Sequence, residues 1–374
     1  MTDGQWLFAV FAALYLLECV RWLPLRAVVL SGSGGKGGWT ASGPLPQAQS
    51  RGAGAFLLPV LPPMQCHLVA MAWPVSPREE GLEVRDGAGA EVRVPWEALA
   101  VKIEGATLHL EAATRARLPC EAAAREWRDR ARAWTAMSQA DRERDFQKAA
   151  KAALDVERVT ELARTLSEST KWLRILAAVI LVWCFGVITL VYRWHGESPL
   201  ALATAGVLLA LQLAQAVLFL RIARRARFPV AHRWWKALAI ALLPQMSTRA
   251  ADFVCKAVTL LPHPLAAREL LGDERWTREA RRFWREARHP AGARSDAPPS
   301  IEAAALQRFF ERQKIALADL EPPPERSGDA RSYCPRCLTV FQIEPGACAD
   351  CGGVELRRFE GTAARASPPS ETPP

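Results

Sequence analysis

Four cysteines near the end of the chain have the spacing of a metal site. Cys334 and Cys337 form one C-x-x-C pair, Cys348 and Cys351 form a second, and ten residues separate the two pairs. Two thiolates from each pair, about 2.3 Å from one ion, satisfy the tetrahedral preference of zinc. Because the protein supplies all four ligands, no coordination position stays open for a substrate. This favours a structural Zn²⁺ over a catalytic one.

The segment YCPRCLTVFQIEPGACADCGG, which holds these cysteines, resembles rubredoxin-type zinc ribbons, and the resemblance covers only residues 331–360. It implies a structural zinc module that binds proteins or nucleic acids. The family has iron-binding members, so iron is the alternative metal. Strand-like sequence follows each pair over 338–343 and 354–359, and Gly352 and Gly353 suit the turn after the second pair. So small a module should fold by binding its metal.

The predicted ribbon is electrically balanced. It contains four arginines and four acidic residues, namely Arg331, Arg336, Arg357, Arg358, Glu344, Asp350, Glu355 and Glu360. A nucleic-acid module would show a positive surplus, so we expect the ribbon to bind a protein.

No other combination of residues predicts catalysis. The histidines are scattered, and none has metal-type spacing to another histidine or to a cysteine; they are His67, His109, His195, His232, His263 and His289. Cys66 and His67 are adjacent, so their side chains would point to opposite faces of a strand and could not form a nucleophile and its base. We therefore expect a protein without enzymatic activity.

Two long uncharged runs predict a transmembrane helical hairpin over residues 172–222. The first, 175–192, has eighteen residues, close to the roughly 20 that a helix needs to cross a bilayer. The second, 200–220, has Gln212 and Gln215 as its strongly polar members. These two lie on one helix face, where amides in lipid would bond to a neighbouring helix.

The N-terminal segment 1–30 is predicted to be an uncleaved membrane anchor. Its apolar run 6–17 lacks the basic start and cleavage site of a signal peptide, and the helix should extend to about Leu25. Basic residues follow this run and flank the hairpin on both sides. The positive-inside rule then places the N-terminus outside and the main soluble parts in the cytoplasm. The same bias accounts for the net charge of +9.

The rest of the chain divides by composition. The predicted pieces are a Gly/Ser/Pro linker (31–53), a small β domain with a closing helix (54–137), a helical stalk (138–171), amphipathic helices (223–320), a Pro-rich linker (321–330), the zinc ribbon (331–360) and a disordered tail (361–374).

Three amphipathic helices are expected within 223–320. Residues 246–261 should form a helix that lies along the membrane surface or, alternatively, packs on the β unit. Residues 274–288 combine aromatic side chains with six arginines. We interpret them as a packed helix, with RNA or acidic lipid binding as the alternative. The last helix should cover 301–320 and lead into a linker that tethers the ribbon.

The sequence thus predicts a multi-domain α+β protein of the bacterial-type inner membrane. It should have a transmembrane helical hairpin, an N-terminal anchor helix, a small all-β cytoplasmic unit, amphipathic helices and a C-terminal zinc ribbon. The expected role is that of a membrane-anchored, non-catalytic protein-interaction or scaffold module. The alternatives are an accessory subunit of a membrane enzyme or transporter, and a membrane-tethered nucleic-acid binder.

Overall fold

The computed structural model describes residues 3–18, 20–23, 27–32, 39–42, 56–59, 66–85, 91–111, 114–118, 120–225, 230–256, 262–290, 299–343 and 346–359. The fold is mixed α+β, and the chain forms two compact units, Met1–Asp273 and Glu274–Pro374. The predicted tail 361–374 lies outside the described residues.

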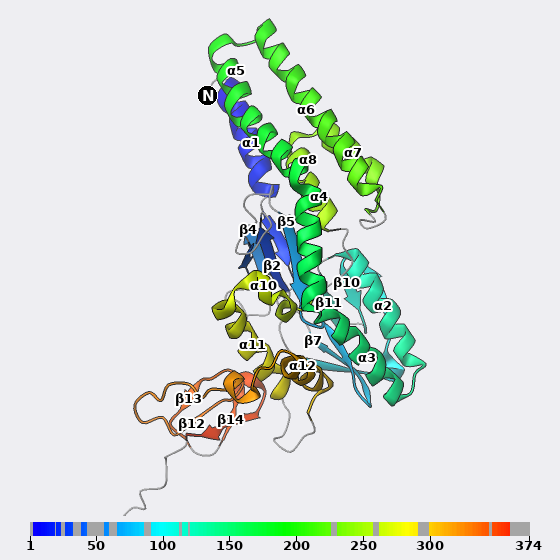
Figure 1. Ribbon diagram of the computed structural model, residues 1–374, viewed down its shortest axis with the longest axis vertical. Helices are drawn as coiled ribbons and strands as arrows, with labels where there is room; N and C mark the ends of the chain where they lie inside the picture. Colours follow the sequence, from blue (N-terminus) through cyan, green and yellow to red (C-terminus); the bar gives the residue numbers. More distant parts are fainter. Residues whose placement is uncertain are drawn as a thin grey trace, which may run out of the picture. The chain divides into compact units, whose positions relative to one another are not determined.

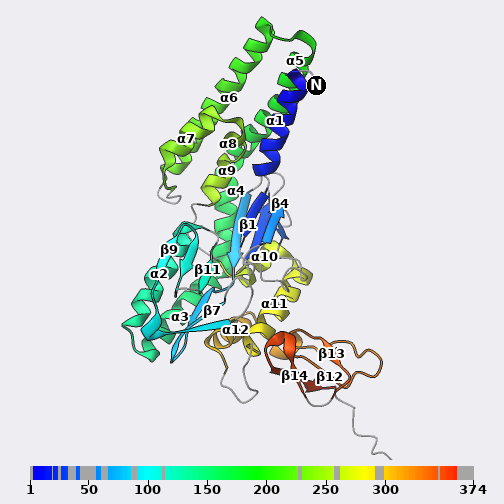
Figure 2. The same ribbon diagram turned by 180° about the vertical axis from the view of Figure 1, so that it is seen from behind.

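Two long helices run side by side in the first unit (Figures 1 and 2). Helix α4 (Val156–Val182) continues through the π-helical segment η3 (Trp183–Ile188) into α5 (Thr189–His195), and α6 (Pro199–Ala223) follows. By length and composition, Val156–His195 and α6 are long and apolar enough to cross a membrane. They contain the two uncharged runs on which the hairpin prediction rests.

Local sequence signals set the ends of these helices. The side chain of Asp155 accepts a hydrogen bond from the backbone N–H of Arg158 at the start of α4, and Ser198 does the same for Ala201 at the start of α6. Such N-caps satisfy donors that a helix otherwise leaves unpaired. Gly196 ends α5 with φ +54°, a backbone conformation that glycine adopts readily.

The π-helical segment lets one helix face two partners. Cys184 and Ile188 are buried in a cluster with Leu208 of α6. Phe185, between them, packs edge-on against three aromatic rings of α1 (Asp3–Glu18), those of Phe8, Phe11 and Tyr15. Trp183 donates its indole N–H to the carbonyl of Thr204 at 3.0 Å. Helix α1 is thus part of a small bundle with α5 and η3.

The predicted anchor helix is too long. Helix α1 ends at Glu18, and the strands β1 (Val20–Leu23) and β2 (Ala27–Gly32) follow it within the expected anchor segment 1–30. The reason is long-range pairing: β1 pairs antiparallel with β4 (Phe56–Pro59), and β2 pairs with β5 (Cys66–Met71). Sixteen residues of helix span about 24 Å, less than the ~30 Å of a hydrocarbon core.

The β elements also extend into the expected linker 31–53, where β3 (Trp39–Ser42) pairs with β2. The remaining strands of the first unit are β6 (Val75–Pro77), β7 (Gly81–Arg85), β8 (Glu91–Pro95), β9 (Lys102–Glu104), β10 (Thr107–His109) and β11 (Arg115–Arg117). The described strands of this unit form four small sheets, ordered β1-β4, β3-β2-β5, β6-β7-β8 and β11-β10-β9. Helix α2 (Glu121–Thr135) follows and buries Trp127 and Trp134 on one face, where its sequence pattern places them.

The expected stalk 138–171 is not one helix. Helix α3 (Gln139–Ala153) ends at Leu154, and α4 starts two residues later with its own cap. Phe146 of α3 is fully buried and contacts the ring of Trp73, so α3 packs on the β unit.

Short helices complete the first unit. They are α7 (Arg233–Leu242), α8 (Pro244–Thr248), α9 (Ala250–Cys255) and α10 (Arg268–Leu271), with 3-10 turns η2 (Trp96–Ala98) and η4 (Pro264–Ala267). The helix predicted over 246–261 is broken at Arg249, and 257–261 lie outside the described residues. The sequence left two alternatives for this segment, a helix along the membrane surface and a helix packed on the β unit. Packing on the β unit is confirmed for α9, because the Sγ of Cys255 lies 3.5 Å from that of Cys66 in β5.

One hydrophobic core joins the β strands to the helices. Val28, Leu30 and Leu68 of β2 and β5 belong to the same buried cluster as Leu166 of α4 and Phe219 of α6. The expected β domain 54–137 is therefore not separate from the helices that follow it.

In the second unit, α11 (Asp273–Arg288) packs on α12 (Ile301–Arg312) through aromatic rings; those in contact include Trp276, Trp284, Phe309 and Phe310. Ser300 caps α12 and donates its hydroxyl to the carbonyl of Ala287 at 2.8 Å. The helix predicted over 301–320 ends earlier, at Arg312, and a 3-10 turn η5 (Leu317–Leu320) follows.

Candidate metal centre

The cysteine segment is built from paired strands of two residues each. Strand β12 (Ser332–Tyr333) lies between β13 (Val340–Phe341) and β16 (Arg357–Arg358), and β14 (Ala347–Cys348) pairs with β15 (Val354–Glu355). The predicted strands 338–343 and 354–359 are thus shorter than expected. Two further strands, β12 and β14, lead into the cysteine pairs.

Each cysteine pair sits in a tight loop closed by backbone hydrogen bonds. The N–H of Leu338 donates to the carbonyl of Cys334, and the N–H of Gly353 donates to that of Cys348, both at 2.9 Å. Leu338 and Gly352 occupy the same place, directly after the second cysteine of each pair, and both have positive φ, +63° and +67°. The two loops therefore have similar turns.

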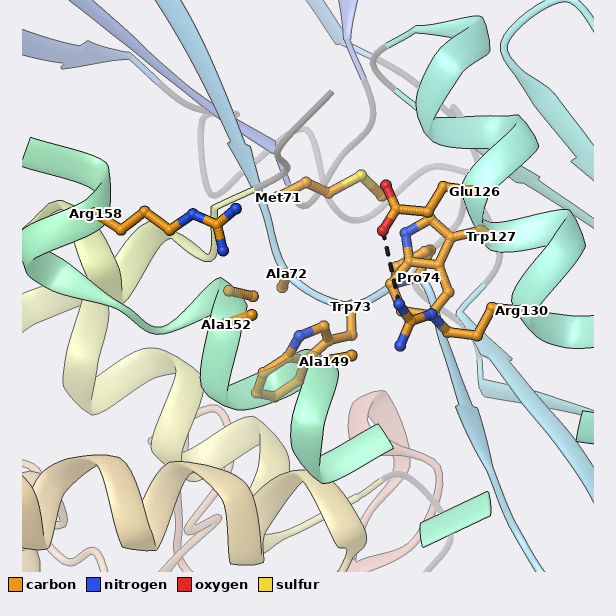
Figure 3. Close-up of a pocket in the computed structure, with 11 residues that line it drawn as sticks. Met71, Ala72, Trp73, Pro74, Glu126, Trp127, Arg130, Ala149, Ala152 and Arg158 are labelled. Carbon is orange, nitrogen blue, oxygen red and sulfur yellow. Dashed lines mark ion pairs between the residues drawn. The ribbon is translucent and has the colours of Figure 1, made fainter. Parts of the chain in front are cut away.

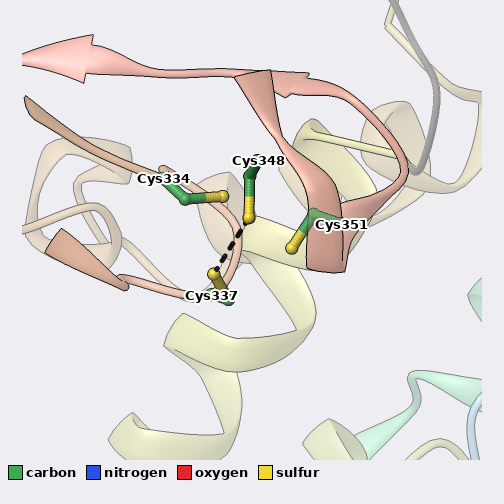
Figure 4. A group of neighbouring side chains, drawn as sticks. All are labelled: Cys334, Cys337, Cys348 and Cys351. Atoms are coloured by element: carbon green, nitrogen blue, oxygen red, sulfur yellow. Dashed lines mark hydrogen bonds between the residues drawn. The ribbon is translucent and has the colours of Figure 1, made fainter. Parts of the chain in front are cut away.

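The four sulfurs converge on one point (Figure 4). All four Sγ atoms lie within 4.8 Å of one another, and those of Cys337 and Cys348 are 3.8 Å apart. A zinc ion with four sulfurs at about 2.3 Å would set sulfur–sulfur distances of about 3.8 Å. The geometry fits a four-thiolate metal site, and the structure brings together all four cysteines predicted to form it.

The surroundings shift the pKa values of the cysteine thiols in opposite directions. A hydrogen bond from Cys351 and the backbone N–H groups of Cys337 and Arg336 lower the pKa of Cys334 to about 5. Burial raises the pKa of Cys348 to about 11, and the hydrogen bond with Cys334, together with burial, raises that of Cys351. One thiolate is thus stabilised by the fold, whereas others need a cation to ionise near neutral pH.

Little apolar surface supports this segment. Its buried cluster contains three of the cysteines with Val354 and Leu356, and Phe341 packs against it. A core of this size does not stabilise a fold by itself, so the site must contribute to folding when it is filled.

The ribbon packs on the helices of the second unit, contrary to the expectation that residues 321–330 merely tether it. Glu321 accepts a 2.9 Å hydrogen bond from Arg357, and its carboxylate lies 3.8 Å from Nε2 of His289 at the end of α11. Arg336, within the first cysteine pair, donates to the His289 carbonyl at 3.3 Å. Burial of Glu321 opposes its ionisation, but the nearby His289 and the hydrogen bond from Arg357 outweigh it and lower its pKa to about 2.

The arginines of α11 make contacts within their own unit. Arg282 pairs with Glu279 at 2.8 Å and lies 3.9 Å from Glu286, while Arg281 donates to the carbonyl of Asp319. These contacts agree with the interpretation of α11 as a packed helix.

Two buried pairs in the first unit were not expected from the sequence. Ser31 Oγ lies 2.8 Å from Nδ1 of His67, and these residues are direct cross-strand partners in β2 and β5. Cys66 meets Cys255 across 189 positions of chain. Only the tertiary fold creates these contacts, so no spacing signal could have found them.

A cavity of about 310 Å³ lies in the first unit beside α2 and α3 (Figure 3). Its lining includes Met71, Trp73, Glu126, Trp127, Arg130 and Arg158. Arg130 lies 3.7 Å from Glu126 and 3.4 Å from Asp145. These contacts pair the guanidinium of Arg130 with acidic side chains of α2 and α3.

No family model, no curated protein and no solved structure matches this chain. The function has to be inferred from the four sulfurs and their surroundings.

Proposed function

We propose that this chain is a membrane-anchored zinc-ribbon protein without enzymatic activity, which presents its ribbon at the cytoplasmic face of the inner membrane to bind another protein. The observation that carries the proposal is the convergence of four Sγ atoms within 4.8 Å of one another. Four protein thiolates complete a tetrahedral coordination shell, which is the arrangement of a structural zinc rather than a catalytic one.

The helices support the membrane anchor. Trp172 and Trp194, at opposite ends of the apolar part of α4 and α5, are 62% and 71% exposed. They are twenty-two residues apart, or about 33 Å along a helix, close to the ~30 Å of a hydrocarbon core. Exposed tryptophans at both ends of an apolar helix are typical of the two membrane interfaces. Lys171 and Arg174 next to Trp172 favour the cytoplasm on that side.

The surface of the ribbon supports a protein partner. Ile343 is 55% exposed, whereas Val354 and Leu356 are buried. An exposed apolar side chain on a charge-balanced module suits a protein interface better than a nucleic-acid backbone. The ion pair of Arg282 with Glu279 inside α11 likewise favours a protein partner over a nucleic acid.

The metal is tested on the full chain purified in mild detergent. Elemental analysis should find one zinc per chain, and Cys348→Ser should lose it. Cys120→Ser is the matched control, because Cys120 lies outside the site, and it should keep the metal. Iron in place of zinc would overturn the metal assignment, and metal retained by Cys348→Ser would overturn the site.

The partner is tested by affinity purification of the full chain and of three variants. A specific protein should be lost from a chain truncated before Arg331 and from Ile343→Asp, but retained by Gln342→Asp, in which an exposed neighbour is changed instead. A partner list that is unchanged by the truncation would overturn the docking role of the ribbon. Retention of a catalytic membrane protein by the truncated chain would instead support an accessory subunit.

A further inference from the structure

Helix α7 is apolar on two opposite faces. Its inner face, with Ala237, Ile240 and Ala241 buried, packs against α6. Its outer face exposes four large apolar side chains, Trp234 (57%), Trp235 (72%), Leu238 (47%) and Leu242 (61%). A helix that is apolar all round belongs in a protein core or a membrane, and a contiguous exposed apolar patch marks a partner.

The charge around α7 identifies the kind of partner. Between Glu197 and Asp252 the sequence has no acidic residue but seven basic ones: Arg221, Arg224, Arg225, Arg227, Arg233, Lys236 and Arg249. The guanidinium of Arg224 lies 5.4 Å from the ring centroid of Trp234. Arg249 pairs with Asp252 at 3.4 Å, whereas no acidic residue lies among the six basic residues from Arg221 to Lys236. Tryptophans beside such a run of basic residues match the interface of a membrane that contains acidic lipids.

The contacts of two glutamines show how far α7 extends along α6. Gln212 Nε2 lies 3.5 Å from the carbonyl of Ile240, and Gln215 donates to the carbonyl of Ser247 at 2.8 Å. Gln215 also donates to the carbonyl of Leu173 at 3.1 Å, next to Trp172 at the proposed membrane interface. Gln212 is three residues further along α6 toward its start, or about 4.5 Å, so the end of α7 lies just inside that interface.

The turn after α7 satisfies its own backbone. Pro244 has no N–H, so the carbonyl of Ile240 lacks its usual helical donor. The hydroxyl of Ser247 replaces that donor at 2.7 Å. The N–H groups of Met246 and Ser247 bond to the carbonyl of Leu243. Non-helical backbone is tolerated at membrane depth only where protein groups satisfy it in this way.

We propose that α7 and α8 form a re-entrant membrane segment. Helix α7 enters the bilayer beside α6 from its basic end, and Leu238 and Leu242 contact acyl chains. Trp235 and the nearby arginines meet acidic headgroups, and the chain turns back at Pro244 just inside the hydrocarbon layer. This inference rests on the proposed membrane anchor, because it takes α6 to span the bilayer.

The test is photo-crosslinking of the full chain in vesicles of phosphatidylcholine and phosphatidylglycerol. Benzoylphenylalanine is placed in turn at Leu238, at Leu242, at Leu213 on the exposed side of α6, and at Glu97 in the β unit. Each variant is first checked for wild-type melting by circular dichroism. Mass spectrometry should find acyl-chain adducts at Leu238, Leu242 and Leu213 and none at Glu97.

The outcomes separate the two proposals. Adducts at Leu213 without adducts at Leu238 and Leu242 would overturn the re-entrant segment and leave the anchor standing. The absence of adducts at Leu213 would overturn the anchor and, with it, the re-entrant segment. Benzoylphenylalanine at Trp235 should capture phosphatidylglycerol above its share of the mixture, and capture in proportion to that share would overturn the headgroup contact.

Discussion

The carboxylate of Glu321 accepts a 2.9 Å hydrogen bond from the guanidinium of Arg357, across thirty-six positions of chain. Glu321 begins the Pro-rich stretch before the ribbon, and Arg357 lies in β16, so this ion pair joins the start of that stretch to the last strand of the ribbon. With His289 close by, it also holds the ribbon against the end of α11.

Glu321→Gln should loosen this contact. The pair is partly exposed, so we expect a loss of about 1 kcal/mol, equivalent to about fivefold faster amide exchange in β12 and β16. Exchange is measured on the zinc-loaded full chain by mass spectrometry. Glu325→Gln is the control, because Glu325 is exposed and nearby. Equal exchange in wild type and Glu321→Gln would show that the pair does not hold the ribbon.

Metal binding should become much tighter as the pH rises. In the metal-free site Cys348 has a pKa of about 11 and that of Cys351 is raised, so both are protonated at pH 7. Zinc must displace both protons, so the dissociation constant should fall by at least about a hundredfold per pH unit around neutrality. Calorimetry in buffers of different ionisation enthalpy counts the protons. Release of fewer than two would contradict the assignment.

The two cysteine loops should respond oppositely to changes at their left-handed residues. Leu338 has φ +63°, which costs a non-glycine residue about 1 kcal/mol, so Leu338→Gly should tighten zinc binding by up to about fivefold. Gly353 has φ +96°, and Gly353→Ala should weaken binding by about fivefold or more. Competition with a chromogenic chelator measures both changes. Effects of the same sign would refute this account of the turns.

A double-mutant cycle tests the turn after α7. Ser247→Ala should destabilise the chain by about 1 kcal/mol, because it leaves the carbonyl of Ile240 with only the longer, 3.5 Å contact of Gln212. In a Pro244→Ala background Leu243, which is extended between α7 and α8, can become helical and bring the new backbone N–H to that carbonyl, so the same change should cost less. Unfolding in detergent micelles gives the four free energies. Strictly additive effects would mean that Ser247 does not compensate for Pro244.

The sequence was informative where the signal is local. The cysteine pairs depend on spacing and the uncharged runs on composition along one segment, and the structure brings the four cysteines together and puts the runs in two long helices. The exact bounds needed more than periodicity. Asp155 caps α4 in the structure, but the sequence predicted one continuous stalk across it, and no signal showed that α12 ends at Arg312.

The sequence failed where pairing with distant residues decides the structure. The residues Val20–Leu23 continue the apolar N-terminal run and look helical, but they pair with Phe56–Pro59. Trp39–Ser42 lies in a stretch whose composition indicates a linker, yet it completes a sheet. The proline-rich stretch after η5 looked like a free tether because the partner of Glu321 is far along the chain.

The shared core of β2, β5, α4 and α6 has a consequence for any molecule that binds the β unit. A domain on a flexible string samples many orientations, and a partner must overcome that rotational freedom. Here six residue pairs hold β2, which follows α1, to β5, and β5 packs on α4 and α9. The strands are thus fixed to the long helices from both sides. A binding partner would meet them already oriented, with less rotational entropy left to lose.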